Sequence, residues 1–170
     1  MNELLYYTQA DREAASAELA KRRWLVYVPA ALLLLLSVAS FIVFRLHRNE
    51  SGWPITALLT MLGGAYFLFF QEVYLLPAKR YHTHVNYMLG NFLREAEGAI
   101  VSLDAEAKDN EGLDCHAMIL NIGHDNDPND ERLFYIDALK GLPEVTQGMR
   151  VRVLSNNRMI AKLEPAPKEN

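Results

Sequence analysis

The hydrophobic pattern of this chain changes character along its length, and the first half is dominated by two long apolar stretches. Residues 24–44 and 53–71 contain no Asp, Glu, Lys or Arg. A helix of about 20 such residues is long enough to cross the hydrocarbon core of a bilayer. We therefore expect a transmembrane hairpin over residues 24–76, with spans at 24–44 and 53–76.

Helical patterns flank the hairpin on both sides. Thr8 and Asp11 have the spacing of a capping box, which predicts a cytoplasmic helix within residues 1–23. Pro77 is expected to end or break the second span. Beyond Pro77, apolar residues recur at helical spacing and predict an amphipathic linker helix over residues 77–97: Tyr81, Val85, Met88, Leu89, Phe92 and Ala96.

After the linker helix the pattern becomes that of short strands separated by polar turns. Five segments are β-branched or aromatic in part: 99–103, 116–122, 132–136, 150–154 and 158–163. Asn156 and Asn157 predict a tight hairpin between the last two strands. Residues 137–141 predict one helical turn. We expect a single domain over residues 98–164 and a disordered tail at 165–170.

Three strands, a short helix and two further strands follow one another in the order of an OB-fold, a five-stranded Greek-key barrel. In this respect the chain resembles membrane proteins of the NfeD type, in which membrane helices carry a small C-terminal OB-like barrel. The resemblance extends over residues 24–164. It implies membrane helices that carry an OB-like barrel. With the residue patterns above, we expect an α+β membrane protein with a two-helix transmembrane hairpin, an amphipathic linker helix and a five-stranded OB-like barrel. The presence of only two spans and the extra linker helix depart from the NfeD type. An SH3-like barrel remains the alternative.

The distribution of Lys and Arg predicts the orientation of the hairpin. Four basic residues precede the first span, two lie between the spans and three follow the second: Arg12, Lys21, Arg22, Arg23; Arg45, Arg48; Lys79, Arg80, Arg94. The positive-inside rule places both termini in the cytoplasm and the short loop at residues 46–52 outside. We expect a multi-pass protein of the cell membrane, of the bacterial inner-membrane type.

No complete catalytic, cofactor or metal motif is present in the sequence, so we assign no catalytic residue, cofactor or metal. The acidic run 124–131 lacks the glycine and the glutamate of a calcium-binding loop, and a solvated hairpin loop is expected there. His82 and His84 face different sides of a helix and are expected to be interfacial polar residues. Cys115 and His116 face opposite sides of a strand, so Cys115 is expected to be a small core residue.

Charge is unevenly distributed within the expected barrel. Residues 97–137 hold eleven acidic and two basic side chains, whereas residues 138–163 hold five basic and one acidic. The basic hairpin offers a contact for anionic lipid or nucleic acid, whereas internal pairing with the acidic half is the favoured interpretation. The spacing of the aromatic residues disfavours nucleic acid. The candidate interaction surface consists of basic and aromatic side chains: Arg150, Arg152, Arg158, Phe134 and Tyr135.

These observations together predict a membrane-anchored, non-enzymatic interaction or scaffold module with a cytoplasmic barrel. The expected partners are membrane lipid and either another membrane protein or a second copy of the chain. The alternative is a subunit of an oligomeric membrane channel or transporter assembly, although the spans carry no internal charge to mark an ion path. An enzyme ranks third.

Overall fold

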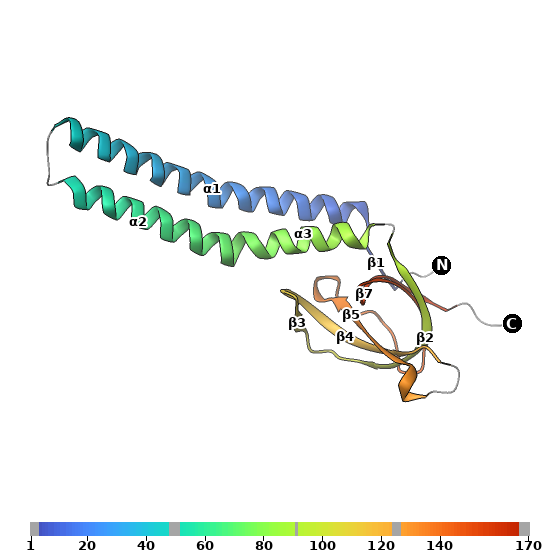
Figure 1. Cartoon of the computed structure of the whole chain (residues 1–170). Helices are drawn as coiled ribbons and strands as arrows, with labels where there is room; N and C mark the ends of the chain where they lie inside the picture. The colour runs from blue at the N-terminus through green and yellow to red at the C-terminus, as the bar shows by residue number, and fades with distance from the viewer. Residues whose placement is uncertain (1–3, 48–51, 91, 124–126, 167–170) are drawn as a thin grey trace. The chain divides into compact units, whose positions relative to one another are not determined.

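The fold combines long helices with one β-sheet, and the chain divides into two compact units (Figure 1). We call residues 14–79 the helical unit, and residues 1–13 with 80–170 the sheet unit. The computed structural model describes residues 4–47, 52–90, 92–123 and 127–166. The expected α+β class is confirmed at this level.

Two long helical segments carry the helical unit. The first is α1 (Gln9–Leu46). The second runs through α2 (Trp53–Phe70), the π-helical turn η2 (Gln71–Leu75) and α3 (Leu76–Met88). Both segments are long and apolar enough to cross a membrane, judged by length and composition. At 1.5 Å per residue, the apolar part of α1 covers about 30 Å, the thickness of the hydrocarbon core.

Small polar residues join α1 to α2. The hydroxyl oxygens of Ser37 and Thr60 lie 2.6 Å apart, and those of Ser40 and Thr56 lie 3.0 Å apart. These bonds give each hydroxyl group a partner in the neighbouring helix. Gly63 allows the close approach, because a Cβ atom there would lie 3.2 Å from the Cβ atom of Leu33. The helices α1 and α2 therefore pack against each other.

The N-terminal helix and the first span, which the sequence suggested as separate elements, form the single helix α1. The capping box at its start is confirmed. The Thr8 backbone N–H donates to Asp11 Oδ2 at 2.7 Å, and the Asp11 backbone N–H donates to Thr8 Oγ1 at 3.3 Å. These bonds satisfy amide groups that a helix terminus otherwise leaves without partners.

The second helix does not end at Pro77, one of the two outcomes expected there, because it continues to Met88. Proline lacks an N–H group, and its ring crowds the carbonyl group four residues earlier. The π-helical turn η2 directly precedes this region and loosens the regular hydrogen-bond pattern, so the chain passes Pro77 without a break. The predicted linker helix over 77–97 is correspondingly too long, since a strand begins at Arg94.

Seven strands among the described residues form one sheet (Figure 1). All five expected strands are present, and two short strands, β1 and β3, were not expected. The strands are β1 (Leu5–Tyr6), β2 (Arg94–Leu103), β3 (Lys108–Asn110), β4 (Leu113–Asn121), β5 (Glu131–Asp137), β6 (Arg150–Asn156) and β7 (Met159–Pro165). Two 3₁₀ turns, η3 (Pro128–Asp130) and η4 (Ala138–Lys140), flank β5. The helical turn expected at 137–141 is η4.

The tail expected at 165–170 begins later than predicted. Pro165 belongs to β7, and the backbone N–H of Ala166 donates to the carbonyl oxygen of Arg150 at 3.0 Å. Residues 167–170 lie outside the described residues. The same holds for residues 48–51 of the loop between the spans.

The strand order is β1-β7-β5-β4-β2-β6, and β6 also pairs with β7. Neighbouring strands are antiparallel except β5 and β7, which pair in parallel at Tyr135 and Met159. The interior of the sheet unit is apolar and contains residues from six strands: Leu5, Ile100, Met118, Leu120, Phe134, Ile136, Val151, Val153, Ile160 and Leu163. Burial of these side chains is the main stabilising contribution to this unit.

Strand β1 comes from the start of the chain and completes the exposed edge of β7. Because β6 pairs along one edge of β7, β5 and β1 must share the other. Leu5 is opposite Leu163, and the backbone N–H of Leu4 donates to the Leu163 carbonyl at 3.0 Å. Leu5 is only 6% exposed and belongs to the core, so the N-terminal segment is part of the sheet unit.

Replacing Leu5 with alanine is expected to lower the free energy of unfolding of the sheet unit by about 3 kcal/mol, because the substitution leaves a cavity in the core. Cys115 is buried and is the single cysteine of the chain, so its labelling by a thiol reagent in rising urea measures unfolding of this unit directly. Tyr6→Ala is the matched control, since Tyr6 is 46% exposed. Equal urea midpoints for the two variants would contradict the role given to Leu5.

Candidate functional site

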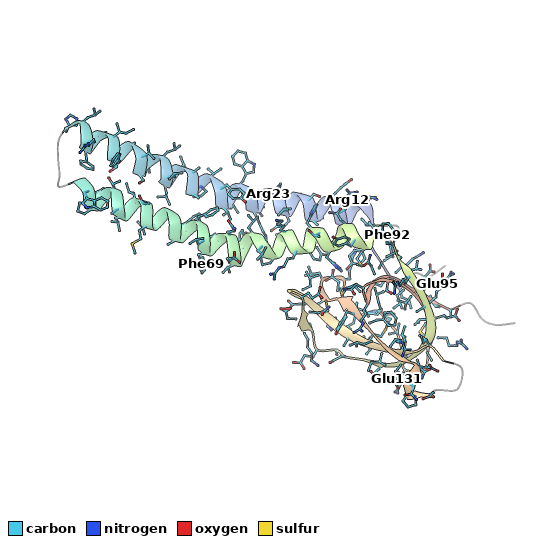
Figure 2. The ribbon with its side chains drawn as sticks, in the orientation of Figure 1. Arg12, Arg23, Phe69, Phe92, Glu95 and Glu131 are labelled. Carbon is cyan, nitrogen blue, oxygen red and sulfur yellow. The ribbon has the colours of Figure 1, made fainter. Side chains whose placement is uncertain are left out.

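An open groove of about 1170 Å³ lies at one end of the sheet unit. It is formed where β2, β5 and β7 begin and where β4 and β6 end. Three of its residues, Phe92, Glu95 and Glu131, are labelled in Figure 2. This volume is slightly larger than that of small-molecule pockets, which usually measure about 300–1,000 Å³. The groove therefore has room for a ligand larger than a single small ion or metabolite.

The segment that enters β2 forms one apolar wall of the groove. Phe92 is 88% exposed, which is unusual for so large an apolar side chain. The amide of Asn156 donates to the Phe92 carbonyl at 3.3 Å, and the Ser155 hydroxyl donates to the Arg94 carbonyl at 3.4 Å. These bonds from the end of β6 hold the backbone on which Phe92 stands. Other apolar lining residues are Leu93, Ala96, Ile122, Leu133 and Phe134.

The groove is lined by three arginines and two glutamates, and one of the glutamates is already paired with an arginine outside the lining. Arg152 Nε lies 2.6 Å from Glu95 Oε1, and the hydrogen bond from Arg152 lowers the pKa of the Glu95 carboxyl. Among the described residues, the side chains of Arg94 and Arg158 have no hydrogen-bond or ion-pair partner. Arg132 Nη1 donates only to backbone carbonyl groups at 2.9 Å. Three arginines therefore face a groove with one unpaired carboxylate, that of Glu131.

Arg158 occupies a backbone conformation that arginine rarely adopts. Asn157 and Arg158 connect β6 to β7 with φ angles of 46° and 68°, in the left-handed region that glycine favours. Such a conformation costs a non-glycine residue about 1 kcal/mol or more. The bond from the Tyr135 backbone N–H to the Arg158 carbonyl, at 2.8 Å, fixes this turn. The turn holds the Arg158 side chain at the edge of the groove.

The structure brings together two of the five candidate residues proposed from the sequence. Phe134 and Arg158 both line the groove, although Phe134 is largely buried in the core. Arg150 and Arg152 instead approach Glu97 and Glu95 of β2, at 3.7 Å and 2.6 Å. These two arginines therefore take part in the internal pairing that the sequence favoured. The fifth candidate, Tyr135, follows Phe134 in β5, points to the opposite face and does not line the groove.

Sequence reasoning missed Phe92, Arg94 and Arg132 as lining residues. Phe92 and Arg94 were placed in the linker helix, where Phe92 completed an apolar helical face. The pair Gly90-Asn91 was the signal against that assignment, because Gly and Asn commonly terminate helices.

Comparison with known proteins does not add to this geometry. No family model matches the chain, and no match was found among curated proteins or solved structures.

A buried polar cluster lies elsewhere in the sheet unit, where three segments distant in sequence meet. The Tyr7 hydroxyl donates to Asp137 Oδ2 at 2.9 Å and lies 2.9 Å from His84 Nε2. Since the single Tyr7 hydroxyl proton goes to Asp137, His84 Nε2 must carry a proton and donate to the Tyr7 oxygen. Asp137 Oδ1 accepts from the Leu139 backbone N–H at 2.9 Å. The expectation that His84 is an interfacial polar residue is wrong, since it is buried here.

The environment of this cluster suppresses ionisation of its neutral members. Burial raises the pKa of the Tyr7 hydroxyl, and the charge of Asp137 adds to this effect. Burial lowers the pKa of His84, with partial opposition from Asp137, so the imidazole is neutral near pH 7. Burial and Asp137 raise the pKa of the Cys115 thiol to about 11. The thiol is therefore protonated and poorly suited to act as a nucleophile.

Lys140 adds a charged connection between η4 and the N-terminal segment. Its Nζ lies 2.7 Å from Asp11 Oδ1 and 4.8 Å from the centre of the Tyr7 ring. Partial burial of Asp11 opposes ionisation, but the hydrogen bonds from Lys140 and Thr8 outweigh it and lower the pKa of the Asp11 carboxyl. The cluster thus fastens residues 7–11 to the sheet.

The acidic run at 124–131 is described only from Asp127 onward. There Asp127 Oδ1 accepts from the Asn129 backbone N–H at 2.9 Å, and the amide of Asn121 donates to the Asp127 carbonyl at 2.8 Å. These are the bonds of a turn. Within the described ranges, no group of three or more His, Cys, Asp or Glu side chains is placed to hold a metal ion. Residues 124–126 lie outside those ranges.

The lowered pKa of His84 predicts that acid destabilises the sheet unit. Below about pH 6.5 His84 becomes protonated in the unfolded chain, whereas it stays neutral in the folded chain. The free energy of unfolding therefore falls as the pH decreases, until the pKa of His84 in the folded chain is reached. His84→Asn retains a donor for Tyr7 and removes the titration. We expect the variant to lose less stability than the wild type between about pH 7.5 and pH 5.5.

Urea titrations of Cys115 labelling at the two pH values measure this difference, with a disulfide reagent that reacts with thiols at both. His82→Asn is the matched control for loss of an imidazole from the same helix. An unchanged pH dependence in His84→Asn would show that the buried histidine does not govern acid sensitivity.

Proposed function

We propose that this chain is a membrane-anchored, non-enzymatic interaction module that binds a partner protein in the groove of its sheet unit. The observation that carries this proposal is the combination of an almost fully exposed Phe92 with arginines that lack side-chain partners among the described residues. Exposed aromatic and arginine side chains around a concave surface are typical of protein interaction sites. The anchor is the apolar hairpin of α1 and α2.

The pairing order supports an OB-like barrel as the architecture that presents the groove. The pairs β2–β4, β4–β5, β5–β7, β7–β6 and β6–β2 return to the starting strand. The parallel contact of β5 with β7 favours the OB-like over the SH3-like arrangement, because a meander of hairpins has antiparallel neighbours only. In such a barrel the groove is its mouth, a frequent place for ligands.

The pairing of β1 with β7 supports the proposed topology. Strand β1 precedes the first candidate span, and β7 follows the second. Two strands that share backbone hydrogen bonds must lie on the same side of a membrane, which requires an even number of crossings. The excess of basic residues beside the spans then favours the cytoplasm as that side.

Two features support a non-enzymatic role. Cys115 is 1% exposed and its thiol is held in the protonated form. Tyr7, His84 and Asp137 are buried, and their hydrogen bonds link separate segments of the sheet unit. A group that attacks a substrate needs access to it. The accessible groove therefore fits a binding role better than these clusters fit catalysis.

Photo-crosslinking in cells tests the groove. A photoreactive amino acid at Phe92 is expected to give a discrete adduct with another protein, because this side chain stands exposed in the groove. The adduct is detected as a band of higher mass on a denaturing gel. Lys108 is the matched control position, since its side chain is 65% exposed on β3 and outside the groove. Adducts of equal yield at both positions, or none at Phe92, would contradict the proposal.

The topology predicts which cysteines an impermeant thiol reagent reaches in intact cells. We expect a cysteine at His47, at the end of α1 between the two candidate spans, to be labelled from outside. A cysteine at Lys108 is expected to be labelled only after the membrane is permeabilised. The natural Cys115 contributes no background because it is buried. Labelling of Lys108→Cys in intact cells would invert the orientation.

A further inference from the structure

We infer that the groove binds a short acidic peptide segment that also carries apolar side chains, an inference that rests on the proposed function and names its partner. The charge of the lining residues is the first support. Arg94, Arg132 and Arg158 come from three different elements and converge on one opening, where Glu131 is the remaining unpaired carboxylate. Carboxylate side chains are the complement that such arginines bind, often with two hydrogen bonds each.

The apolar part of the groove requires apolar groups in the ligand. Phe92 and Ile122 are 88% and 39% exposed, and they stand beside the partly buried Leu93 and Leu133. Water contact with these side chains is unfavourable, so a ligand that covers them gains affinity. An inorganic anion or a small carboxylic acid would leave these apolar side chains in contact with water. A peptide supplies carboxylates and apolar side chains together, within a length that a groove of about 1170 Å³ accommodates.

The rigidity of the groove rim supports recognition of a defined segment. The Arg158 turn keeps left-handed backbone angles with the help of the Tyr135 bond, and the Phe92 carbonyl is held by Asn156. Groups held in place before binding lose less freedom when the ligand arrives. A strained backbone that positions an arginine at a rim is the kind of feature found at binding sites.

Single-stranded nucleic acid fits the same lining less well. Sequence-independent strand binding uses several exposed aromatic rings on which successive bases stack. Phe92 is the exposed aromatic residue of this groove, whereas Phe134 is 7% exposed. The observations favour the peptide.

The test uses the full-length protein in lipid nanodiscs and a phage-displayed library of short random peptides. We expect enriched sequences to contain Asp or Glu together with aromatic or aliphatic residues. Synthetic peptides of these sequences should bind the wild type, with affinity that weakens as salt rises. Arg158→Glu should weaken binding by at least about tenfold, because it reverses one charge at the rim. Arg150→Glu is the matched control on β6, outside the groove.

Protection of Cys115 from thiol reagents confirms that each variant is folded. Enrichment of basic peptides, tighter binding of a short oligothymidylate than of any peptide, or equal losses for Arg150→Glu and Arg158→Glu would each overturn the inference. Absence of any enriched acidic peptide would also overturn it. If Phe92 still forms its specific adduct in cells in that case, the proposed function stands while the peptide class is wrong. If the adduct is missing as well, both fail.

Discussion

The backbone pairing of the N-terminal segment with β7 is the interaction on which the rest of this structure depends. It covers the part of the β7 edge that β5 leaves open and brings Leu5 into the core. It also sets Tyr7 in position to meet His84 and Asp137. One short strand therefore links the start of the chain, the end of the second helical segment and the last strand. An open β7 edge would leave backbone groups unpaired and available to other chains.

The sequence predicted the five main strands and the two apolar helices because each carries a strong local signal. Alternating apolar residues and turn residues mark the strands, and the absence of charge marks the helices. Strand β1 has no such signal. It is two residues long, and its partner lies more than 150 positions away in the sequence. These residues form a strand because they pair with the edge of β7 that is still open. That edge exists only once the sheet has folded, so the local sequence does not reveal it.

The candidate site shows the same division between local and distant information. Arg158 was predicted from the basic character of the last hairpin, which is local. Phe92 and Arg132 reach the groove because β2 and β5 begin at the same end of the sheet, and this follows from strand order. The assignment of Phe92 to a helix failed because its apolar spacing was given more weight than the helix-ending residues Gly90 and Asn91.

The position of β1 also determines the order in which the protein completes itself during synthesis. Leu5 leaves the ribosome more than 150 residues before its partner Leu163. Both apolar helices are made in the interval. The backbone groups of β1 therefore stay unpaired until both helices have been synthesised and β7 has joined the sheet. Contacts of such long sequence separation form slowly. During that interval the N-terminal segment is exposed to pairing with the wrong partner.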